Sequence, residues 1–194
     1  MQSERDSQKM RVFGAIGLNG SGKDEVIKYL NKRYGIPFVS LGDMVRQIAA
    51  QKGIPPTRGN LHSISGEYIQ QFGKDYFMKL VIKQIEENRW EKAGVTGIRT
   101  PEDVQVLRDY YENCFVLFHV YVSDPYIRYE RTRMRGEQRD PKTYQEFLEQ
   151  DMKEEELFRV REAVRLADFS LNNEGSRDDL HHKLDAIITV KGLL

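Results

Sequence analysis

The sequence predicts an α/β protein with a central parallel sheet, and three features carry this prediction. Short apolar runs of strand length alternate with longer segments of helical periodicity, the order that gives parallel strands joined by right-handed crossovers. The run at residues 115–122 is continuously apolar, as in a strand covered on both faces. A glycine-rich stretch separates the first strand from the first helix, where α/β sheets bind ligands. We therefore expect three layers, with five strands between helices.

Composition limits the domain organisation and the possible partners. The chain has 194 residues, enough for one domain with a sizeable core. Residues 1–9 are polar, lack the apolar segment of a signal peptide and are predicted to be a disordered extension, so the domain spans 10–194. Thirty basic and thirty acidic residues give zero formal charge, which favours neither nucleic acid nor a membrane surface. The single cysteine, Cys114, excludes an internal disulfide and suits the cytoplasm.

Residues 17–24, Gly-Leu-Asn-Gly-Ser-Gly-Lys-Asp, follow an apolar strand and open a helix. This order and spacing fit the phosphate-binding P-loop pattern G-x-x-x-x-G-K-[ST], except at its last position. Glycines let backbone N–H groups turn inward around an anion, and the helix start adds its positive dipole end. The residues expected to hold ATP here are Gly17, Asn19, Gly20, Ser21, Gly22, Lys23 and Asp24, with Lys23 also catalytic at the β- and γ-phosphates.

Asp24 stands where the pattern has Ser or Thr. A carboxylate is a hard oxygen ligand, so Asp24 is a candidate Mg²⁺ ligand, directly or through water. Without a metal it would repel phosphate. The alternative is an acidic residue favoured in the first turn of a helix, and the sequence does not separate the two.

The elements follow in order from apolar patterns and turn residues. Apolar stripes, proline at first helical positions and glycine at helix ends set the boundaries. Asp43 is the candidate N-cap of the helix after the second strand, and the Glu-rich helix 143–166 is interpreted as a solvated face. The expected order is strand 12–17, helix 23–33, strand 37–40, helix from 42, loop 53–60, helices 61–72 and 75–90, strand 94–98, helix 102–112, strand 115–122, helix 125–135, helix 143–166, strand 168–171 and helix 177–190.

Two arginines follow strands whose carboxyl ends lie at the edge where α/β sheets bind ligands. Arg46 lies shortly after the second strand and Arg99 directly after the third. The planar guanidinium binds phosphate oxygens in bidentate fashion and stays charged. We expect both to bind the phosphate of a second substrate.

Three segments resemble known kinases. Residues 40–46, Ser-Leu-Gly-Asp-Met-Val-Arg, and 95–100, Val-Thr-Gly-Ile-Arg-Thr, resemble the segments of adenylate-kinase-type enzymes whose arginines grip the acceptor phosphate. Residues 167–176 look like the end of dephospho-CoA kinases, where the turn lies near the adenine of ATP. With residues 56–61, the ensemble resembles dephospho-CoA-kinase-like P-loop proteins.

The resemblance implies a three-layer P-loop NTPase fold, with ATP and Mg²⁺ as cofactors. It places Asn173 and Gly175 beside ATP, and Asp43, Arg46, Arg58 and Arg99 on the acceptor. It also implies a helical acceptor-binding insertion at about 42–92. The sequence departs from these relatives in two places. Thr96 stands where many relatives carry an acidic residue, which weakens water-mediated Mg²⁺ binding there, and Asp24 could compensate. The Phe-Glu ending found in dephospho-CoA kinases is missing, which weakens the dephospho-CoA assignment.

A basic helix supplies candidates for an arginine-bearing lid at about 128–142. Arg128, Arg131 and Arg135 are spaced to share one helix face. In nucleotide kinases such a lid neutralises charge on the transferred group, which is the main catalytic contribution in phosphoryl transfer. Arg131 and Arg135 are the first catalytic candidates, with Arg139 behind them. The alternative is a solvated charged helix.

These observations favour a cytoplasmic kinase that moves the γ-phosphoryl group of ATP to a small phosphorylated acceptor, most simply a (deoxy)nucleoside monophosphate. A second possibility is transfer to a ribose hydroxyl, as in dephospho-CoA kinases, with Asp43 as catalytic base. A third is a nucleotide-binding regulatory protein without catalysis. The expected partner is the small-molecule acceptor, with no nucleic acid or membrane, and the chain is expected to be a monomer or homodimer.

Overall fold

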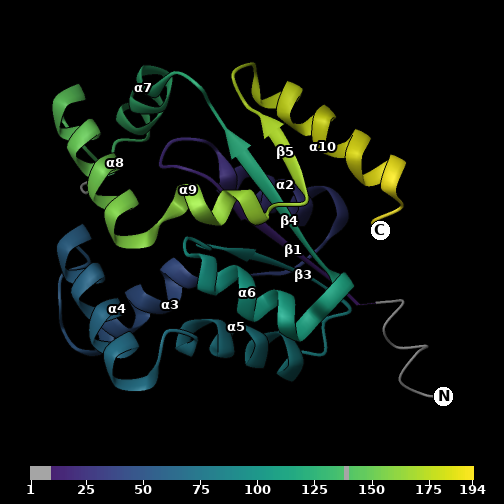
Figure 1. Ribbon diagram of the computed structural model, residues 1–194, viewed down its shortest axis with the longest axis horizontal. Coiled ribbons are helices and arrows are strands. Elements are labelled where there is room, and N and C mark those ends of the chain that lie inside the picture. Colours follow the sequence, from purple (N-terminus) through teal and green to yellow (C-terminus); the bar gives the residue numbers. More distant parts are fainter. Residues whose placement is uncertain (1–9, 138–139) are drawn as a thin grey trace.

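The structure is a computed structural model in which residues 10–137 and 140–194 are described, and it contains a parallel five-stranded sheet between two helical layers (Figure 1). The strands lie in the order β2-β3-β1-β4-β5. Every pairing is parallel, so all five carboxyl ends lie at one edge. The predicted fold class is confirmed. The strands are β1 (Arg11–Ile16), β2 (Phe38–Ser40), β3 (Lys92–Thr96), β4 (Phe115–Tyr121) and β5 (Phe169–Asn172).

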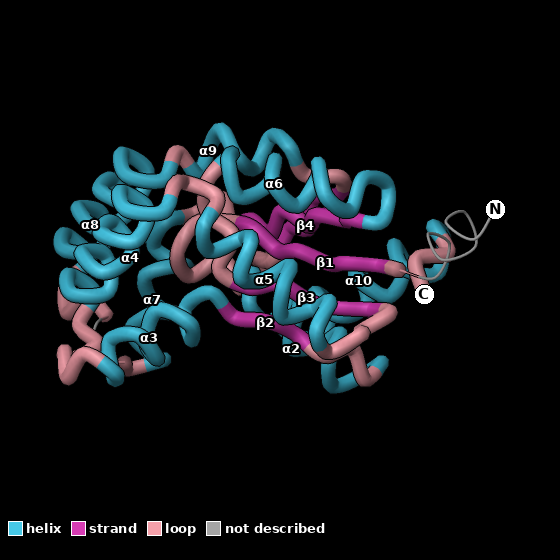
Figure 2. Tube along the Cα trace, turned by 90° about the horizontal axis from the view of Figure 1, so that it is seen from below, coloured by secondary structure: helices cyan, strands magenta, loops and turns pink. Residues whose placement is uncertain are grey.

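Helices on each face of the sheet build separate cores because alternate strand residues point to opposite sides. On one face Val12 and Ile16 pack with α5, α6 and α9, and on the other Phe13 and Ala15 pack with α2 and α10. Figure 2 shows α6 and α9 along one side of the strands. The helices are α2 (Lys23–Tyr34), α3 (Leu41–Gln51), α4 (Arg58–Phe72), α5 (Tyr76–Glu87), α6 (Pro101–Tyr111), α7 (Pro125–Arg135), α8 (Tyr144–Phe158), α9 (Val160–Ala163) and α10 (Arg177–Lys191), with 3₁₀ turns at Glu112–Cys114 and Val164–Leu166.

The helices between β2 and β3 have an apolar cluster of their own. Residues of α3, α4 and the start of α5 form it, and Tyr68 and Tyr76 pack against it. The neighbouring rings of Phe72 and Phe77 contact these two tyrosines. Helices α3, α4, α7 and α8 gather at one end of the sheet (Figures 1 and 2).

Two predicted helix starts are wrong. Ser40, not Asp43, caps α3: its hydroxyl accepts a hydrogen bond from the Asp43 N–H, which places Asp43 inside the first turn. The sequence offers both side chains at this turn, and the last residue of the strand does the capping. Helix α4 begins at Arg58 rather than at residue 61, because Thr57 accepts a hydrogen bond from the Asn60 N–H.

The predicted single helix over 143–166 is broken, and only part of its charged surface is the solvated face that was predicted. Arg159 adopts a left-handed conformation with φ of 51° and ends α8 before the short helix α9 begins. Phe147 and Glu154 of α8 are buried. Charged residues on α8 therefore include some that are enclosed by the protein, and they face the loop at the start of α2.

Candidate functional site

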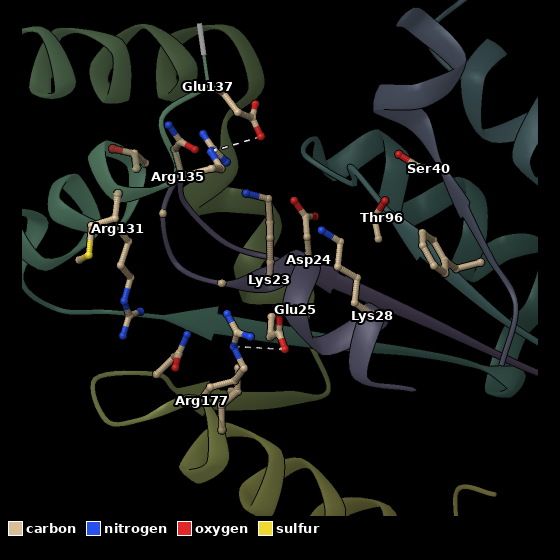
Figure 3. A pocket seen from close by; sticks show the side chains of 18 of the residues that line it. Lys23, Asp24, Glu25, Lys28, Ser40, Thr96, Arg131, Arg135, Glu137 and Arg177 are labelled. Carbon is tan, nitrogen blue, oxygen red and sulfur yellow. Dashed lines mark ion pairs between the residues drawn. The ribbon is translucent and has the colours of Figure 1, made fainter. Parts of the chain in front are cut away.

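A large cleft opens at the carboxyl edge of the sheet, with a volume of about 890 Å³. It runs from the loop before α2 to α3 on one side, and to α7 and the start of α10 on the other. Figure 3 shows Lys23, Asp24 and Lys28 projecting from α2 into this space, with Arg135, Arg131 and Arg177 around them. The sequence-predicted residues that line the cleft are Asn19, Gly20, Gly22, Lys23, Asp24, Asp43, Arg46, Arg131, Arg135, Asn173 and Gly175.

The loop at 17–24 has the backbone that anion binding requires. Gly20 and Gly22 have φ of 77° and 90°, which L side chains rarely adopt. Gly22 is the N-cap of α2 and no side-chain hydrogen bond caps this helix start in the part of the chain that the structure describes. The first N–H groups of α2 are thus left for a ligand. Gly17 does not line the cleft; a Cβ there would overlap the Val120 carbonyl oxygen and crowd the buried Ser21 hydroxyl.

Lys23 carries the mobile charge of the loop. Its amino group lies 3.5 Å from the Leu18 carbonyl oxygen and points towards Arg135 in Figure 3. Burial lowers the pKa of Lys23 below its usual value, while the neighbouring Asp24 raises it and Arg99 lowers it further. Because these surroundings disfavour the charged form of Lys23, an anion that enters the cleft would stabilise this charge.

Asp24 is exposed and lines the cleft beside Lys23. Among residues 10–137 and 140–194, no group of three or more His, Cys, Asp and Glu side chains gathers as a metal centre. One carboxylate beside a phosphate loop nevertheless fits Mg²⁺, which is often held by one or two carboxylates together with substrate phosphates and water.

The cleft is locally basic although the chain is neutral overall. Its described lining includes the basic residues Lys23, Lys28, Arg46, Arg131, Arg135 and Arg177 against the acidic residues Asp24, Glu25, Asp43 and Glu137. Arg177 also pairs with Glu25, with Nε 3.6 Å from Oε1. This excess of positive charge favours an anionic ligand.

The predicted lid arginines lie in two different environments. Arg131 and Arg135 line the cleft, and Nη1 of Arg131 is buried without a hydrogen-bond partner among the described atoms. Arg135 pairs with Asp140 and Glu137, and Asp140 raises the pKa of Arg135. Arg128 does not share their surroundings: it is buried against α8. Arg139 lies outside the described residues.

On the acceptor side, Ser40, Asp43, Arg46 and Thr96 line the cleft. The Arg46 Nε donates to Asp43 Oδ1 at 3.2 Å, and this bond lowers the pKa of Asp43 more than its partial burial raises it. Asp43 is therefore an ionised carboxylate within the cleft. Thr96 ends β3 and is buried.

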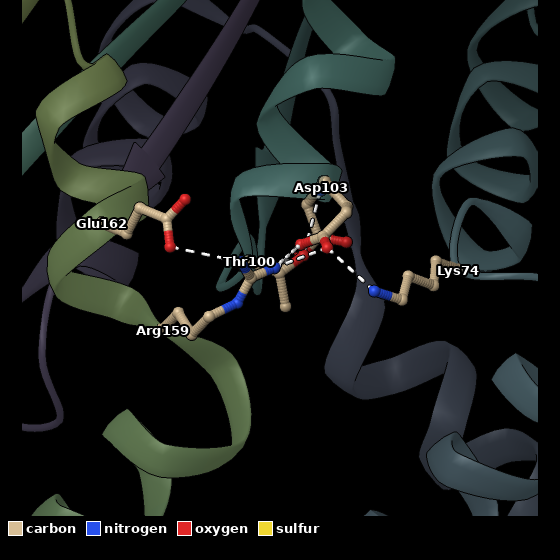
Figure 4. Close-up of polar contacts among 6 residues, drawn as sticks. Lys74, Thr100, Asp103, Arg159 and Glu162 are labelled. Atoms are coloured by element: carbon tan, nitrogen blue, oxygen red, sulfur yellow. Dashed lines mark hydrogen bonds and ion pairs between the residues drawn. The ribbon is translucent and has the colours of Figure 1, made fainter.

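Arg99 lies on a fixed turn after β3. The Asp103 carboxylate accepts hydrogen bonds from the N–H groups of Arg99 and Thr100 at 3.0 and 2.9 Å, and Thr100 in turn caps α6. Figure 4 shows Lys74 and Arg159 converging on the same helix start, where both pair with Glu102. Arg99 does not line the cleft: its guanidinium lies 5.1 Å from the Phe158 ring centre.

Arg58 also lies outside the cleft lining, and it is ion-paired with the buried Glu154 of α8. The carboxylate of Glu154 also has Arg99 and Lys23 near it, and together with Arg58 they hold the pKa of Glu154 below its usual range despite burial. Glu154 thus balances cations next to the loop at 17–24. Arg58 pairs with this carboxylate and Arg99 lies near enough to lower its pKa, and neither of these predicted acceptor arginines lines the cleft.

The turn after β5 contacts the phosphate-binding loop directly. Asn173 is buried, and its side-chain N–H donates to the Ser21 carbonyl oxygen at 2.8 Å. A Cβ on Gly22 would overlap this amide, so the close approach requires glycine. Gly175 follows on the cleft wall.

Sequence reasoning missed several residues of the site. Lys28 follows Asp24 by four residues and so shares its helix face, a signal that the spacing offered. Arg177 is the first residue of α10, directly after the turn that was assigned to ATP. Asp151 and Glu154 gave no signal, because their partners Arg128 and Arg58 lie on other helices.

The fold and the loop at its carboxyl edge define a P-loop kinase-like protein. A family model described as an AAA domain matches residues 16–148, more than half of the chain. A UPF0200 protein of Pyrococcus horikoshii is 35% identical over 176 residues, which cover 90% of this chain and 94% of that protein. The chain therefore belongs to the AAA domain family and to the UPF0200 proteins.

Solved structures of small-molecule kinases share the fold. A shikimate kinase from Bacteroides thetaiotaomicron superposes with a TM-score of 0.57 at 16% identity, covering 94% of this chain and 98% of that one. A gluconokinase from Sinorhizobium meliloti 1021 gives 0.56 at 13% identity, covering 94% of each chain. No helix among the described residues has the length and apolar character needed to cross a membrane.

Proposed function

We propose that this protein is an ATP-dependent kinase that transfers the γ-phosphoryl group to a small phosphorylated acceptor, with a (deoxy)nucleoside monophosphate as the first candidate. The observation that carries the proposal is one cleft in which the uncapped start of α2, Lys23, Arg131 and Arg135 face the same space as Arg46. Donor and acceptor phosphates would then lie within one basic enclosure.

The roles follow from charge and position. The N–H groups of the loop at 17–24 bind the triphosphate, and Lys23 carries its charge to the phosphate that moves. Arg131 and Arg135 approach from α7 and neutralise the charge that spreads over the transferred group. Asn173 and Gly175 border the nucleotide from the turn after β5. Arg46 would bind the acceptor phosphate, and Arg99 would reach it only by moving from its position beside the Phe158 ring.

Mg²⁺ would be held by Asp24 together with phosphate oxygens, and it would supply further neutralisation of the triphosphate. The exposed carboxylate of Asp24 at the start of α2 is compatible with this role. We place the reaction in the cytoplasm, with the acceptor as the partner and without nucleic acid or membrane.

A second candidate is transfer to a hydroxyl group, as in dephospho-CoA kinases. The observation in its favour is the ionised Asp43 carboxylate, which lines the cleft and already accepts a hydrogen bond from Arg46. A hydroxyl acceptor needs a base, whereas a phosphate acceptor is already ionised.

The test is a panel of acceptors assayed for ADP formation with ATP and Mg²⁺. The panel contains ribonucleoside and deoxyribonucleoside monophosphates, dephospho-CoA, and unphosphorylated polyols and sugar acids. Turnover with a nucleoside monophosphate supports the first proposal, and turnover with dephospho-CoA or a polyol supports the second. Tight ATP binding without transfer to any of these acceptors would indicate a nucleotide-binding regulatory protein instead.

A further inference from the structure

Arg128 connects the phosphate-binding loop to helix α8. Its guanidinium forms a two-bond pair with Asp151, with Nη1–Oδ1 at 2.8 Å and Nη2–Oδ2 at 2.7 Å. The same Nη1 donates to the Asn19 carbonyl oxygen at 3.0 Å. The side chains of Arg128 and Asp151 are 4% and 10% exposed, so this arginine is not available to a nucleotide.

The hydrogen bond to Asn19 has a consequence for the loop because peptide bonds are planar. No cis peptide occurs among the described residues, and in a trans peptide the C=O of one residue and the N–H of the next point in opposite directions. Holding the Asn19 carbonyl towards Arg128 therefore turns the Gly20 N–H away from Arg128. Asn19 and Gly20 both line the cleft whereas Arg128 does not, so the side of the peptide opposite Arg128 is the side on which an anion would lie.

The main chain of Arg128 supports the same peptide. A Cβ on Gly20 would overlap the Arg128 carbonyl oxygen, so the backbone of α7 lies directly against the loop. If the Asn19–Gly20 peptide were flipped, a carbonyl oxygen would face the phosphates and repel them. Arg128 thus contacts the Asn19–Gly20 peptide with both its side chain and its backbone, and both contacts bear on whether this peptide is oriented to bind an anion.

We propose that Arg128 and Asp151 are positioning residues for nucleotide binding: Arg128 fixes the orientation of the Asn19–Gly20 peptide, and Asp151 fixes Arg128. The inference rests on the proposed nucleotide site but not on catalysis. The pair carries no net charge, so its effect on the nucleotide is geometric rather than a long-range attraction.

The alternative is that the pair only joins α7 to α8, and a set of variants separates the two. Arg128→Lys keeps the charge but loses the two-bond geometry, and Asp151→Asn removes the charge that holds the guanidinium. The double variant Arg128→Met with Asp151→Leu replaces the buried pair by apolar side chains, a change that is often neutral or stabilising for the fold. It also removes the donor to Asn19.

A matched control is Arg108→Lys. Arg108 pairs with Asp168 at 3.0 Å and donates to the Phe115 carbonyl oxygen, so it is also a pair tied to the backbone. Asp168 and Phe115 lie at the amino ends of β5 and β4, at the opposite edge of the sheet from the cleft.

The measurement is the Kd of a non-hydrolysable ATP analogue by calorimetry, with the thermal unfolding temperature of each variant. We expect Arg128→Lys and the double variant to bind about ten-fold or more weakly, the loss that one charged hydrogen bond supports, while the double variant stays folded near the wild-type temperature. Arg108→Lys should lose stability and keep its Kd. A wild-type Kd in the folded double variant would overturn the inference alone. A wild-type protein that binds neither ATP nor GTP analogues would overturn the proposed function with it.

Discussion

The Arg46 guanidinium donates a hydrogen bond to the Asp43 carboxylate three residues earlier on α3, with Nε 3.2 Å from Oδ1. Both side chains line the cleft that holds Lys23. A phosphate acceptor would have to compete with Asp43 for this arginine. A hydroxyl acceptor would instead find a carboxylate that Arg46 keeps ionised, since this bond lowers the pKa of Asp43. The Asp43–Arg46 pair is therefore where the two proposed acceptor chemistries make different demands on the site.

Arg46→Ala and Arg99→Ala are expected to raise the KM for a phosphorylated acceptor about ten- to a hundred-fold, because each removes a charged hydrogen bond to phosphate. The KM for ATP should change little. Steady-state kinetics with each substrate varied in turn measures both. Lys32→Ala, an exposed residue in the last turn of α2, is the control for loss of a positive charge. Equal effects on both substrates would show that the acceptor site is placed wrongly.

Lys23→Ala is expected to reduce transfer by roughly 10²–10³-fold or more, the loss seen when one preorganised electrostatic contact to the reacting group is removed. Lys23 lies outside the apolar clusters of the core, so the fold should persist. Single-turnover rates with circular dichroism on the same sample measure both. Unchanged turnover in the folded variant would contradict the kinase proposal.

The fold was predictable because its signals are local. Apolar runs locate all five strands, and glycine spacing locates the loop at 17–24 before any tertiary contact is known. Helix boundaries were harder to predict where two side chains could cap the same helix, as Ser40 and Asp43 could at the start of α3. The break at Arg159 was hidden as well, since a left-handed arginine has no composition signal.

Part of the site was predictable. Lys23, Asp24 and Arg46 follow strand ends, and the charge spacing of the basic helix identified Arg131 and Arg135, which also line the cleft. A position after a strand end is not sufficient, because Arg99 directly follows β3 and does not line the cleft. The buried ion pairs were not predictable from the sequence, because Arg128 and Asp151 are 23 residues apart and Arg58 and Glu154 are 96 residues apart. Charge patterns along one helix cannot show that an acid on α8 faces an arginine from another element, so α8 was interpreted as a solvated helix.

His119 of β4 is expected to make stability depend on pH. Burial lowers the pKa of His119, so the folded chain takes up its proton at lower pH than the unfolded chain, whose pKa is about 6.5. Stability is full above that value and falls as the pH drops below it. Burial also lowers the pKa of His62, which acts in the same direction.

Urea unfolding at pH 7.5 and 5.5 measures this effect, and His119→Gln is the informative variant. The free energy of unfolding of the wild type should fall more between the two pH values than that of the variant, because glutamine does not titrate. Parallel losses in both proteins would show that His119 is as easily protonated in the fold as in the unfolded chain.

Asp43→Asn distinguishes the two acceptor chemistries. A nucleoside monophosphate attacks with an oxygen that is already ionised, so the variant should keep appreciable activity. A ribose hydroxyl needs a base, and a positioned base contributes about 10²–10⁴-fold. Because Ser40 caps α3, the substitution leaves the helix cap in place, and thermal unfolding is the control for the fold.

We expect kcat on the best acceptor to fall less than about ten-fold, since asparagine removes the charge near Arg46 but no reacting group. A fall of about a thousand-fold in a folded protein, with the KM for ATP unchanged, would refute the monophosphate proposal and assign Asp43 as the base for a hydroxyl acceptor.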